Sequence, residues 1–349
     1  MQTVAVNTQN KSYPVHIGAG LLAQLTTLPG VPTPKTAMLV SDSNVDVLYA
    51  GRVMQSLTTA GIRAVKFVFP AGEERKNLGV YGQLLEAMAK ARLTRADNIF
   101  ALGGGVVGDL AGFAAATYLR GIRFVQIPTT LLAAVDSSVG GKTGVNLGAG
   151  KNLAGAFWQP DAVICDTDAL ATLPPKRIAD GLAEMLKHGM IADAALFDSL
   201  CRADTLGAIA ALIPRNVEIK AVVVGEDECE RGNRALLNFG HTIAHAIEKH
   251  SDYVITHGHA VALGMLAVTR AAERQGLCAP CANILEAALT KHNLPTACPY
   301  TVDELLPYVL SDKKRGADEI TLVIPQRIGE CVLHKMPLDV LPQFFEGCL

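Results

Sequence analysis

His241, His245, His257 and His259 lie close together at the end of the stretch that begins at Glu230. His241 and His245 are four residues apart and would share one face of a helix, whereas the other two follow after a short polar break. Neutral imidazole is the commonest protein ligand of Zn²⁺, and a catalytic zinc site needs three protein ligands and one open position. The carboxylate that often completes such a set would have to come from elsewhere in the chain. The same histidines also fit ordinary polar helix positions beside a loop, and spacing alone does not decide between the two.

A glycine-rich segment, GGGVVGD, follows a predicted strand and precedes a predicted helix. Gly103, Gly105 and Gly108 match G-x-G-x-x-G, and in that context the helix N-terminus favours a pyrophosphate. The motif is weak by itself, because it is not in the first strand–helix unit and no acid follows about 20 residues later to hold a ribose. Tight packing of the helix against the strand is the alternative explanation of these glycines.

A second glycine-rich segment, DSSVGGKTG, begins at Asp136 and contains Lys142. It is not a nucleotide P-loop, because that motif would require glycine at position 136. A glycine-rich turn with a lysine still predicts an anion site, which Lys151 and Asn152 would close.

The composition excludes several classes of protein. The chain has 349 residues, of which 50% are hydrophobic and 18% are charged, and its formal net charge is −2. We therefore expect a substantial core and neither nucleic-acid nor membrane binding. No apolar run approaches the roughly 20 residues of a membrane helix, and the N-terminus has no signal-peptide pattern.

Eight cysteines are spread along the chain, which fits reduced thiols and predicts a cytoplasmic protein. Cys278 and Cys281 have the C-x-x-C form. They follow a predicted helix end rather than a strand, which disfavours a redox or metal role.

Short apolar runs alternate with helical periodicity up to about residue 168, and helical periodicity dominates afterwards. The alternation predicts a Rossmann-like, doubly wound parallel sheet, with ligands beyond the carboxyl ends of its strands. We predict an α/β domain over residues 1–168 and a mainly α-helical domain over 169–349. The predicted strands are 2–6 and 13–17, which form an edge hairpin, then 36–40, 64–69, 98–102, 124–127, 162–166 and 320–324. The predicted helices include one that ends near residue 60 and those over 78–90, 110–118, 178–188, 208–224 and 259–274.

Several segments closely resemble the 3-dehydroquinate synthases of the shikimate pathway. They are GGGVVGDLAGF, RGIRFVQIPTTLLAAVDSSVGGKTGVN, KNLAGAFWQP, GLAEMLKHG, and RALLNFGHTIAHAIE followed by HGHAVALGM. These segments cover most of the chain from residue 70 to 265, and their order and spacing are specific. Iron-type alcohol dehydrogenases share the fold and the GGG-x-x-x-D loop, but would not be expected to carry the AVDSSVGGKT and NFGHT segments together.

The resemblance implies a lyase that uses NAD and Zn²⁺ or Co²⁺ and acts on a phosphorylated sugar acid. It would convert 3-deoxy-D-arabino-heptulosonate 7-phosphate to 3-dehydroquinate and phosphate. The implied steps are transient oxidation of a hydroxyl, β-elimination of phosphate, re-reduction and intramolecular aldol closure. Oxidation makes chemical sense as the first step, because a ketone acidifies the neighbouring C–H bond.

The resemblance also implies roles for individual residues. Glu184, His241 and His257 would hold the metal, whereas His245 and Glu230 would transfer protons and His259 would be structural. Lys220 and Arg234 would bind the substrate carboxylate, and Arg120 would reach the partner's site in a homodimer. Lys142, Asn152, Asn238 and one lysine of the pair Lys313 and Lys314 would contact phosphate, and Asp136 and Lys187 would contact hydroxyls. NAD contacts would come from Asp42, Glu73, Lys76, Gly104, Gly105, Asp109, Thr129, Thr130, Lys142, Lys151 and Thr172.

Three other functions are open at this point. A sugar-phosphate cyclase of secondary metabolism would act on a substrate without a carboxylate, and Lys220 and Arg234 argue against it, because buried cations that face no anion are costly. A polyol dehydrogenase of the same fold would release NADH. A non-catalytic binding module would need no metal.

Overall fold

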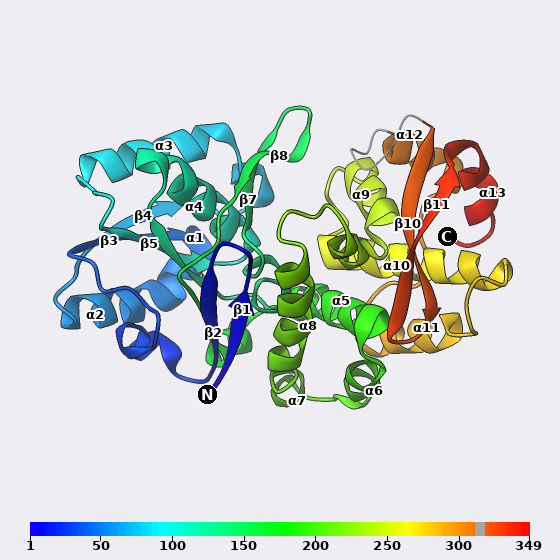
Figure 1. Cartoon of the computed structure of the whole chain (residues 1–349), viewed down its shortest axis with the longest axis horizontal. Helices are drawn as coiled ribbons and strands as arrows, with labels where there is room; N and C mark the ends of the chain where they lie inside the picture. The colour runs from blue at the N-terminus through cyan, green and yellow to red at the C-terminus, as the bar shows by residue number, and fades with distance from the viewer. Residues whose placement is uncertain (311–317) are drawn as a thin grey trace. The chain divides into compact units, whose positions relative to one another are not determined.

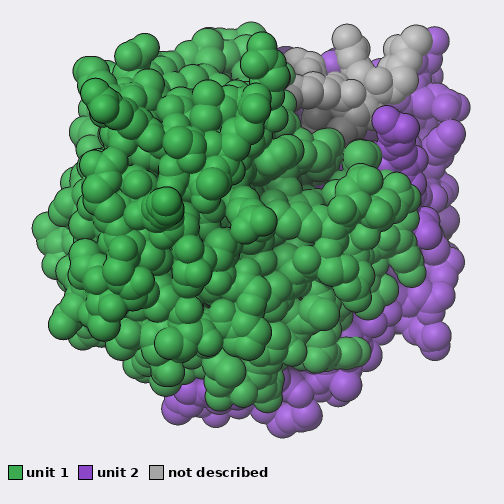
Figure 2. Space-filling view, turned by 60° about the vertical axis from the view of Figure 1, so that its left-hand side comes forward, with its two compact units in different colours: residues 1–173, 213–229 green, residues 174–212, 230–349 purple. Residues whose placement is uncertain are grey.

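The computed structural model of the chain describes residues 1–310 and 318–349. It has two compact units: unit 1 comprises residues 1–173 and 213–229, and unit 2 comprises residues 174–212 and 230–349 (Figure 2). The predicted boundary at 168 lies near the end of the first segment of unit 1, but the prediction did not include residues 213–229 in that unit. Among the described residues, no helix has both the length and the apolar character needed to cross a membrane.

Unit 1 is built on a sheet whose strands lie in the order β1-β2-β9-β6-β5-β3-β4. Figure 1 labels β1 to β5 of this sheet. β1 and β2 form the predicted antiparallel hairpin at one edge, and the other neighbours pair in parallel. The strands are β1 (Gln2–Asn7), β2 (Ser12–Gly18), β3 (Thr36–Asp42), β4 (Arg63–Phe69), β5 (Asn98–Gly103), β6 (Arg123–Pro128) and β9 (Ala162–Asp166). All six residues of β5 are buried, as expected for an apolar strand covered by helices on both faces.

Helices cover both faces of this sheet. One core includes Val53 and Leu57 of α2 (Gly51–Thr59), and a second core includes Leu84 of α3 (Leu78–Lys90) and Leu110 of α4 (Gly105–Thr117). The predicted doubly wound fold is therefore confirmed. The chain passes from β3 outward to β4 and then returns to β5 on the other side of β3, so the strand order reverses at the carboxyl ends of β3 and β5. This reversal is where open α/β sheets bind ligands.

The shorter helical segments of unit 1 are 3₁₀ turns, π-helical turns or single α-helical turns. They are η1 (Leu21–Ala23), η2 (Leu25–Thr27), α1 (Ser43–Val45), η3 (Asp46–Ala50), η4 (Glu73–Arg75), η5 (Tyr118–Arg120), η6 (Ala133–Ser137) and η7 (Thr167–Thr172). The longer α8 (Ile213–Glu226) joins the unit from later in the chain.

Two predictions for unit 1 are wrong. α4 begins at Gly105 rather than at residue 110, because glycine and valine at its start read as a loop in the sequence. The segment around Lys142 and Lys151 is a hairpin of β7 (Lys142–Leu147) and β8 (Gly150–Phe157), rather than a turn and a loop. Its glycine content hides the strands, yet a small residue is needed there, since a Cβ at Gly155 of β8 would overlap the carbonyl oxygen of Thr143 of β7.

Unit 2 is mainly helical, as predicted. Its elements are α5 (Pro175–Ala192), α6 (Ala194–Arg202), α7 (Leu206–Ala210), η8 (Asn233–Asn238), α9 (His241–His250), α10 (His257–Arg274), α11 (Ala282–Lys291), α12 (Val302–Leu310), β10 (Glu319–Arg327), β11 (Glu330–Pro337), η9 (Leu338–Val340) and α13 (Leu341–Phe345). Three predictions need correction here. The predicted helix 208–224 is two helices, α7 and α8; α10 starts at His257 rather than at 259; and β11 was not predicted.

α9 and α10 approach closely through two glycines. Gly240 precedes α9 with φ of 79°, a left-handed conformation that glycine adopts without strain. A Cβ at Gly264 of α10 would overlap the carbonyl oxygen of Gly240. The absence of a side chain at both positions therefore sets the spacing of the two helices that carry His241 and His257.

We predict that Gly264→Ala lowers the free energy of unfolding by about 1–3 kcal/mol, because the new methyl group meets main chain that cannot move aside. Gly82→Ala in α3 is the matched control, since a Cβ there meets nothing within 4 Å. That control should leave stability unchanged or raise it by about 0.5–1 kcal/mol. Urea denaturation followed by circular dichroism measures both, and equal midpoints for the two variants would contradict the prediction.

Candidate active site

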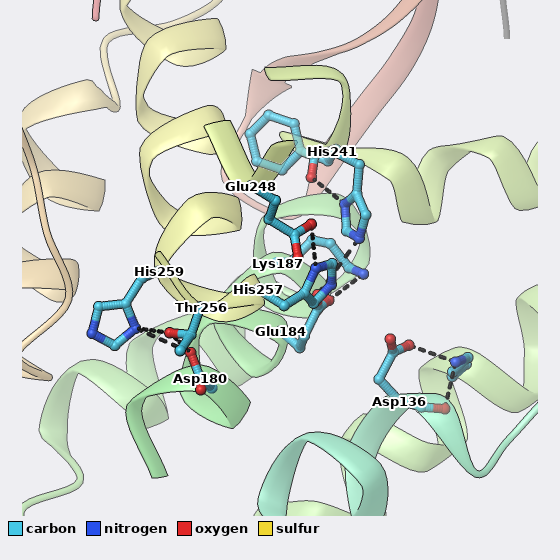
Figure 3. Close-up of polar contacts among 11 residues, drawn as sticks. Asp136, Asp180, Glu184, Lys187, His241, Glu248, Thr256, His257 and His259 are labelled. Carbon is cyan, nitrogen blue, oxygen red and sulfur yellow. Dashed lines mark hydrogen bonds and ion pairs between the residues drawn. The ribbon is translucent and has the colours of Figure 1, made fainter. Parts of the chain in front are cut away.

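Glu184, His241 and His257 converge in unit 2 from three different helices (Figure 3). The Nε2 atoms of His241 and His257 lie 3.6 Å and 3.3 Å from Oε1 of Glu184. One donor atom from each residue lies within 4.8 Å of the others. Two imidazole nitrogens and one carboxylate oxygen form the ligand set of a catalytic zinc site, so these residues could hold Zn²⁺ or Co²⁺.

The two imidazole rings are oriented by hydrogen bonds on their far sides. Nδ1 of His241 lies 3.2 Å from the carbonyl oxygen of Phe239, and Nδ1 of His257 lies 3.1 Å from Oε2 of Glu248. A proton on each Nδ1 leaves the lone pair of Nε2 directed at Glu184. This is the usual arrangement of metal-binding histidines, in which a carbonyl or carboxylate fixes the ring, so the three residues fit a divalent metal.

Charges around the three residues are balanced within the unit. Glu184 is fully buried and forms an ion pair with Lys187, which lies three residues later on α5. Burial and then Lys187 lower the pKa of His241 well below its usual value of 6.5. Burial alone would lower the pKa of His257 too, but Glu248 and Glu184 raise it to about 10. In the absence of a metal, a proton on His257 therefore supplies positive charge beside two carboxylates.

Glu248 is a candidate functional residue that the sequence reasoning missed. It is 4% exposed, and its carboxylate meets the imidazole of His257. A signal was present, because Glu248 follows His241 by seven residues and so shares its face of α9. A buried acid on the same helix face as a proposed metal ligand is a candidate for a group that orients a ligand histidine. Here Glu248 shares the face of His241 and contacts His257.

His259 belongs to a separate polar cluster that fixes the start of α10 (Figure 3). Its Nδ1 lies 3.0 Å from both Oδ1 of Asp180 and Oγ1 of Thr256, and Thr256 donates to the same carboxylate at 2.6 Å. Burial would raise the pKa of Asp180, but the hydrogen bonds from His259 and Thr256 hold it below its usual value. Asp180 belongs to α5, so the cluster ties α10 to the helix that carries Glu184.

The two residues proposed to transfer protons, His245 and Glu230, both belong to unit 2. The exposed ring of His245 has its centroid 5.6 Å from that of His241 and 6.4 Å from that of His257, yet it is outside the three-residue donor group. Asn238 donates to Oε1 of Glu230 at 2.7 Å. Glu230 has φ of 57°, a left-handed backbone conformation that is uncommon for a glutamate. Arg234 lies in the same segment and is 1% exposed.

In unit 1, five of the residues proposed to contact NAD lie at the strand reversal. Asp42 ends β3 and accepts from the amides of Asn44 at 2.9 Å and Val45 at 3.0 Å. Gly104 and Gly105 begin α4, where amides point outward. Thr129 and Thr130 follow β6, and the amide of Thr129 donates to the carbonyl oxygen of Gly103 at 2.9 Å.

The glycines of the motif have two different roles. A Cβ at Gly104 or Gly105 would stand 3.1 Å from Thr130 or Ser137 and would narrow the space at the helix N-terminus. A Cβ at Gly103 would overlap Val107, and one at Gly108 would stand 2.5 Å from Gln126 of β6. Packing therefore explains Gly103 and Gly108, whereas Gly104 and Gly105 leave room for main-chain contact with a pyrophosphate, so these residues fit a dinucleotide.

A second polar group of unit 1 contains three more of the residues proposed to contact NAD, which are Glu73, Lys76 and Asp109. Nζ of the buried Lys76 lies 2.9 Å from Oδ2 of Asp109 and 3.5 Å from Oε1 of Glu73. Burial would lower the pKa of Lys76, but Asp109 and Glu73 raise it above its usual value. Asp109, an unusual acid in a phosphate-binding motif, is thus accompanied by a cation. Asn146 of β7, which sequence reasoning missed, donates to Glu73 at 2.8 Å.

The remaining predicted residues are distributed as follows. Nζ of Lys220 donates to both Oδ1 and the main-chain oxygen of Asp136, each at 2.5 Å. Lys142 is exposed on β7, and Lys151 and Asn152 lie on β8, where Asn152 has φ of 53°.

Oγ1 of Thr172 lies 2.6 Å from the hydroxyl of Tyr49. Arg120 is exposed, with φ of 66°. The lysines at 313 and 314 lie outside the described residues.

Comparison with known proteins identifies the family. Residues 66–180 match the family described as 3-dehydroquinate synthase N-terminal, and residues 181–315 match 3-dehydroquinate synthase C-terminal. A 3-dehydroquinate synthase of Streptococcus suis (strain 05ZYH33) is 42% identical over 355 aligned residues, which cover 98% of this chain and 99% of that protein. The chain belongs to the 3-dehydroquinate synthase family. A 3-dehydroquinate synthase of Streptococcus sanguinis (strain SK36) is also 42% identical, over 352 residues.

Solved structures of related cyclases have the same fold. A 2-deoxy-scyllo-inosose synthase complexed with carbaglucose-6-phosphate, NAD⁺ and Co²⁺ is 27% identical with a TM-score of 0.88, over 98% of this chain and 100% of that one. ValA, a 2-epi-5-epi-valiolone synthase from Streptomyces hygroscopicus subsp. jinggangensis 5008 with NAD⁺ and Zn²⁺ bound, is 27% identical with a TM-score of 0.87, over 96% of each chain. A glycerol dehydrogenase of Schizosaccharomyces pombe, 18% identical with a TM-score of 0.64, shares the fold alone.

The raised pKa of His257 predicts a pH-dependent metal affinity. A divalent ion must displace the proton that His257 holds below a pKa of about 10, so affinity should rise as the pH rises toward that value. Between about pH 6 and 8, one displaced proton gives an increase in apparent Zn²⁺ affinity of up to about tenfold per pH unit. Competition with a chromophoric chelator at several pH values measures it. An affinity independent of pH would show that no proton is displaced.

We further predict that Glu248→Gln weakens Zn²⁺ binding about 10- to 100-fold, because the imidazole of His257 loses the charged acceptor that orients it. Glu218→Gln is the matched control, since Glu218 is exposed on α8 and pairs with Arg215. Isothermal titration calorimetry compares the two variants with the unaltered chain. Equal Zn²⁺ affinities in all three proteins would exclude an orienting role for Glu248.

Proposed function

We propose that the chain catalyses the 3-dehydroquinate synthase reaction, in which 3-deoxy-D-arabino-heptulosonate 7-phosphate yields 3-dehydroquinate and phosphate. The observation that carries this function is 42% identity to 3-dehydroquinate synthases over nearly the whole chain. The cluster of Glu184, His241 and His257 supports it, because the reaction begins at a hydroxyl that a metal would bind. When bound, NAD⁺ supplies reversible oxidation of this hydroxyl, and Zn²⁺ or Co²⁺ polarises it as a Lewis acid.

The residues of unit 2 would bind the metal and move protons. Glu184, His241 and His257 would provide its three protein ligands, with Lys187 beside them to contact a substrate hydroxyl. His245 is exposed and near both ligand histidines, so it could take and return a proton during phosphate elimination. The hydrogen bond between Glu230 and Asn238 supports a second proton-transfer position, at which Asn238 would also contact phosphate.

Cations of the chain would bind the two anionic groups of the substrate. Arg234 presents a planar guanidinium, which suits a carboxylate in bidentate geometry, and Lys220 would contribute a second positive charge. The bonds from Lys220 to Asp136 hold that ammonium group in place and support a role for Asp136 in contacting a hydroxyl. Lys142 and Asn152 would contact the phosphate.

Unit 1 would bind the dinucleotide at the strand reversal. Main-chain amides of Gly104 and Gly105 would bind the pyrophosphate, and Lys76 would balance its charge. The complete set of proposed NAD contacts is Asp42, Glu73, Lys76, Gly104, Gly105, Asp109, Thr129, Thr130, Lys142, Lys151 and Thr172.

We also propose that the enzyme is a cytoplasmic homodimer in which Arg120 reaches the partner's site. All eight cysteines are free thiols, which supports a reducing compartment. Arg120 is exposed, and its left-handed backbone and that of Leu119 support a loop shaped for an intermolecular contact.

A related sugar-phosphate cyclase of secondary metabolism is the second candidate function. The structural similarity to the inosose and valiolone synthases, at TM-scores of 0.88 and 0.87, favours it. The identity to those two proteins is 27%, against 42% to the 3-dehydroquinate synthases. The 3-dehydroquinate synthase reaction is therefore the better supported.

The deciding experiment offers the purified protein 3-deoxy-D-arabino-heptulosonate 7-phosphate and sedoheptulose 7-phosphate in parallel, and follows phosphate release. We expect phosphate release from the first substrate, dependent on both NAD⁺ and Zn²⁺ or Co²⁺. No net NADH absorbance should accumulate, since the cofactor is regenerated in each turnover. Preferential turnover of sedoheptulose 7-phosphate would instead establish the second function, and stoichiometric NADH would indicate a simple dehydrogenase.

A further inference from the structure

A second group of potential metal ligands lies in unit 2, at the junction of α10 and α11. Glu273 is near the end of α10, Cys278 is in the connecting loop, and Cys281 is the residue before α11. One donor atom from each of the three lies within 4.8 Å of the others. The group shares no residue with the proposed active site. Their position after a predicted helix end disfavoured a metal role in the sequence, and the structure adds a carboxylate that lies next to the two thiols.

The backbone around the three side chains is held in place by hydrogen bonds. Oε1 of Glu273 accepts from the amides of Cys281 and Ala282, so the carboxylate bridges from α10 to the N-terminus of α11. Between the two cysteines, the amide of Ala279 donates to the carbonyl oxygen of Gln326 on β10 at 2.8 Å. The loop is thus fixed at both ends and in its middle, which is the preorganisation that a metal site requires.

The donor types indicate which class of ion would bind. Two sulfur atoms and one carboxylate oxygen suit Zn²⁺ and other thiophilic divalent ions, whereas Mg²⁺ and Ca²⁺ prefer oxygen alone. Without a metal both thiols are protonated, since burial and then the neighbouring thiol raise the pKa of Cys281 to about 12, and burial and then Glu273 raise that of Cys278. An entering ion would replace both S–H protons, which would pass to water. The product, with two thiolates and one carboxylate, would carry one net negative charge.

A third thiol lies beside this group. Cys331 of β11 is 8% exposed and pairs in register with Pro325, the residue before Gln326. Its Sγ donates to the carbonyl oxygen of Met190 at 3.6 Å, and it is not one of the three clustered donors. Burial and then Cys281 and Cys278 raise its pKa. Cys331 is therefore a buried thiol near the group and not one of its ligands.

We propose that Glu273, Cys278 and Cys281 form a second metal site, which binds Zn²⁺ or a similar thiophilic divalent ion and ties the end of α10 to the start of α11. The proposal does not depend on the proposed enzymatic function. The residues proposed to bind the first ion contain no sulfur, so the two sites can be distinguished by spectroscopy.

Co²⁺ is the probe, because coordination to thiolate produces a sulfur-to-cobalt charge-transfer absorption in the near ultraviolet that nitrogen and oxygen ligands do not give. We expect the fully reduced chain to bind two Co²⁺ ions per chain and to show this absorption, and added Zn²⁺ to abolish it. Glu184→Ala should bind one ion fewer and keep the absorption. A reduced chain of unaltered sequence that binds Co²⁺ without any charge-transfer absorption would overturn the proposal, whatever the behaviour of the variants.

The variant Cys278→Ser/Cys281→Ser should lose the absorption and one bound ion. Its matched control is Cys201→Ser/Cys298→Ser, which removes two half-buried thiols of the same unit and should change neither. Glu273→Gln keeps both sulfurs and should retain the absorption, with Co²⁺ affinity weaker by about tenfold or more. Circular dichroism establishes that each variant is folded. If the control variant lost the absorption and the Cys278→Ser/Cys281→Ser variant kept it, the thiolate ligands would lie elsewhere and the assignment would be wrong.

Discussion

The structure of unit 2 depends on the burial of one carboxylate. Glu184 is fully buried, and an uncompensated carboxylate at such a position would be strongly destabilising. Lys187 on the same helix and the imidazoles of His241 and His257 provide the compensation. The two imidazoles come from α9 and α10, so the compensation of Glu184 requires both helices to lie close to α5.

Further hydrogen bonds hold the ligand histidines and their helices in place. Glu248 orients His257, the carbonyl oxygen of Phe239 orients His241, and Asp180 holds the start of α10 through Thr256 and His259. None of these contacts would bind an ion itself, but together they fix the two imidazole rings before any ion arrives. Loss of an outer contact should therefore affect metal affinity more than it affects the fold.

Most of the sheet of unit 1 could be predicted from the sequence, because its strands are short apolar runs bounded by turn residues. β9 and α3 have the predicted bounds, and β3 and β5 differ from prediction by one or two residues. The hairpin of β7 and β8 was missed, since its glycines and alanines have low strand propensity and it is held by packing on α4. The extent of α4 was missed for a related reason: Gly105 and Gly108 lower helix propensity but are required by their neighbours.

In the candidate site, the types of the functional residues were easier to predict from the sequence than the residues that they contact. Spacing pointed to the histidines, but it could not choose between His245 and His257. It could not supply Glu184 either, because α5 is far in sequence from α9 and α10, which carry the histidines. Resemblance to a family supplied that choice, and the structure brings the three residues together. The partners Glu248 and Asn146, and the pairing of Glu273 with the two cysteines, depend on tertiary contacts that a linear pattern does not contain.

The return of α8 to unit 1 has a consequence for synthesis on the ribosome. Gly225 lies against the carbonyl oxygen of Asn7, with no space for a side chain, and Glu228 accepts hydrogen bonds from Asn10 and Gln159. A nascent chain that ends near residue 173 therefore lacks the segment that covers its own first hairpin. The N-terminal unit cannot be completed until residue 229 has emerged from the exit tunnel, so residues 174–212 of the other unit leave the ribosome before its own last segment does.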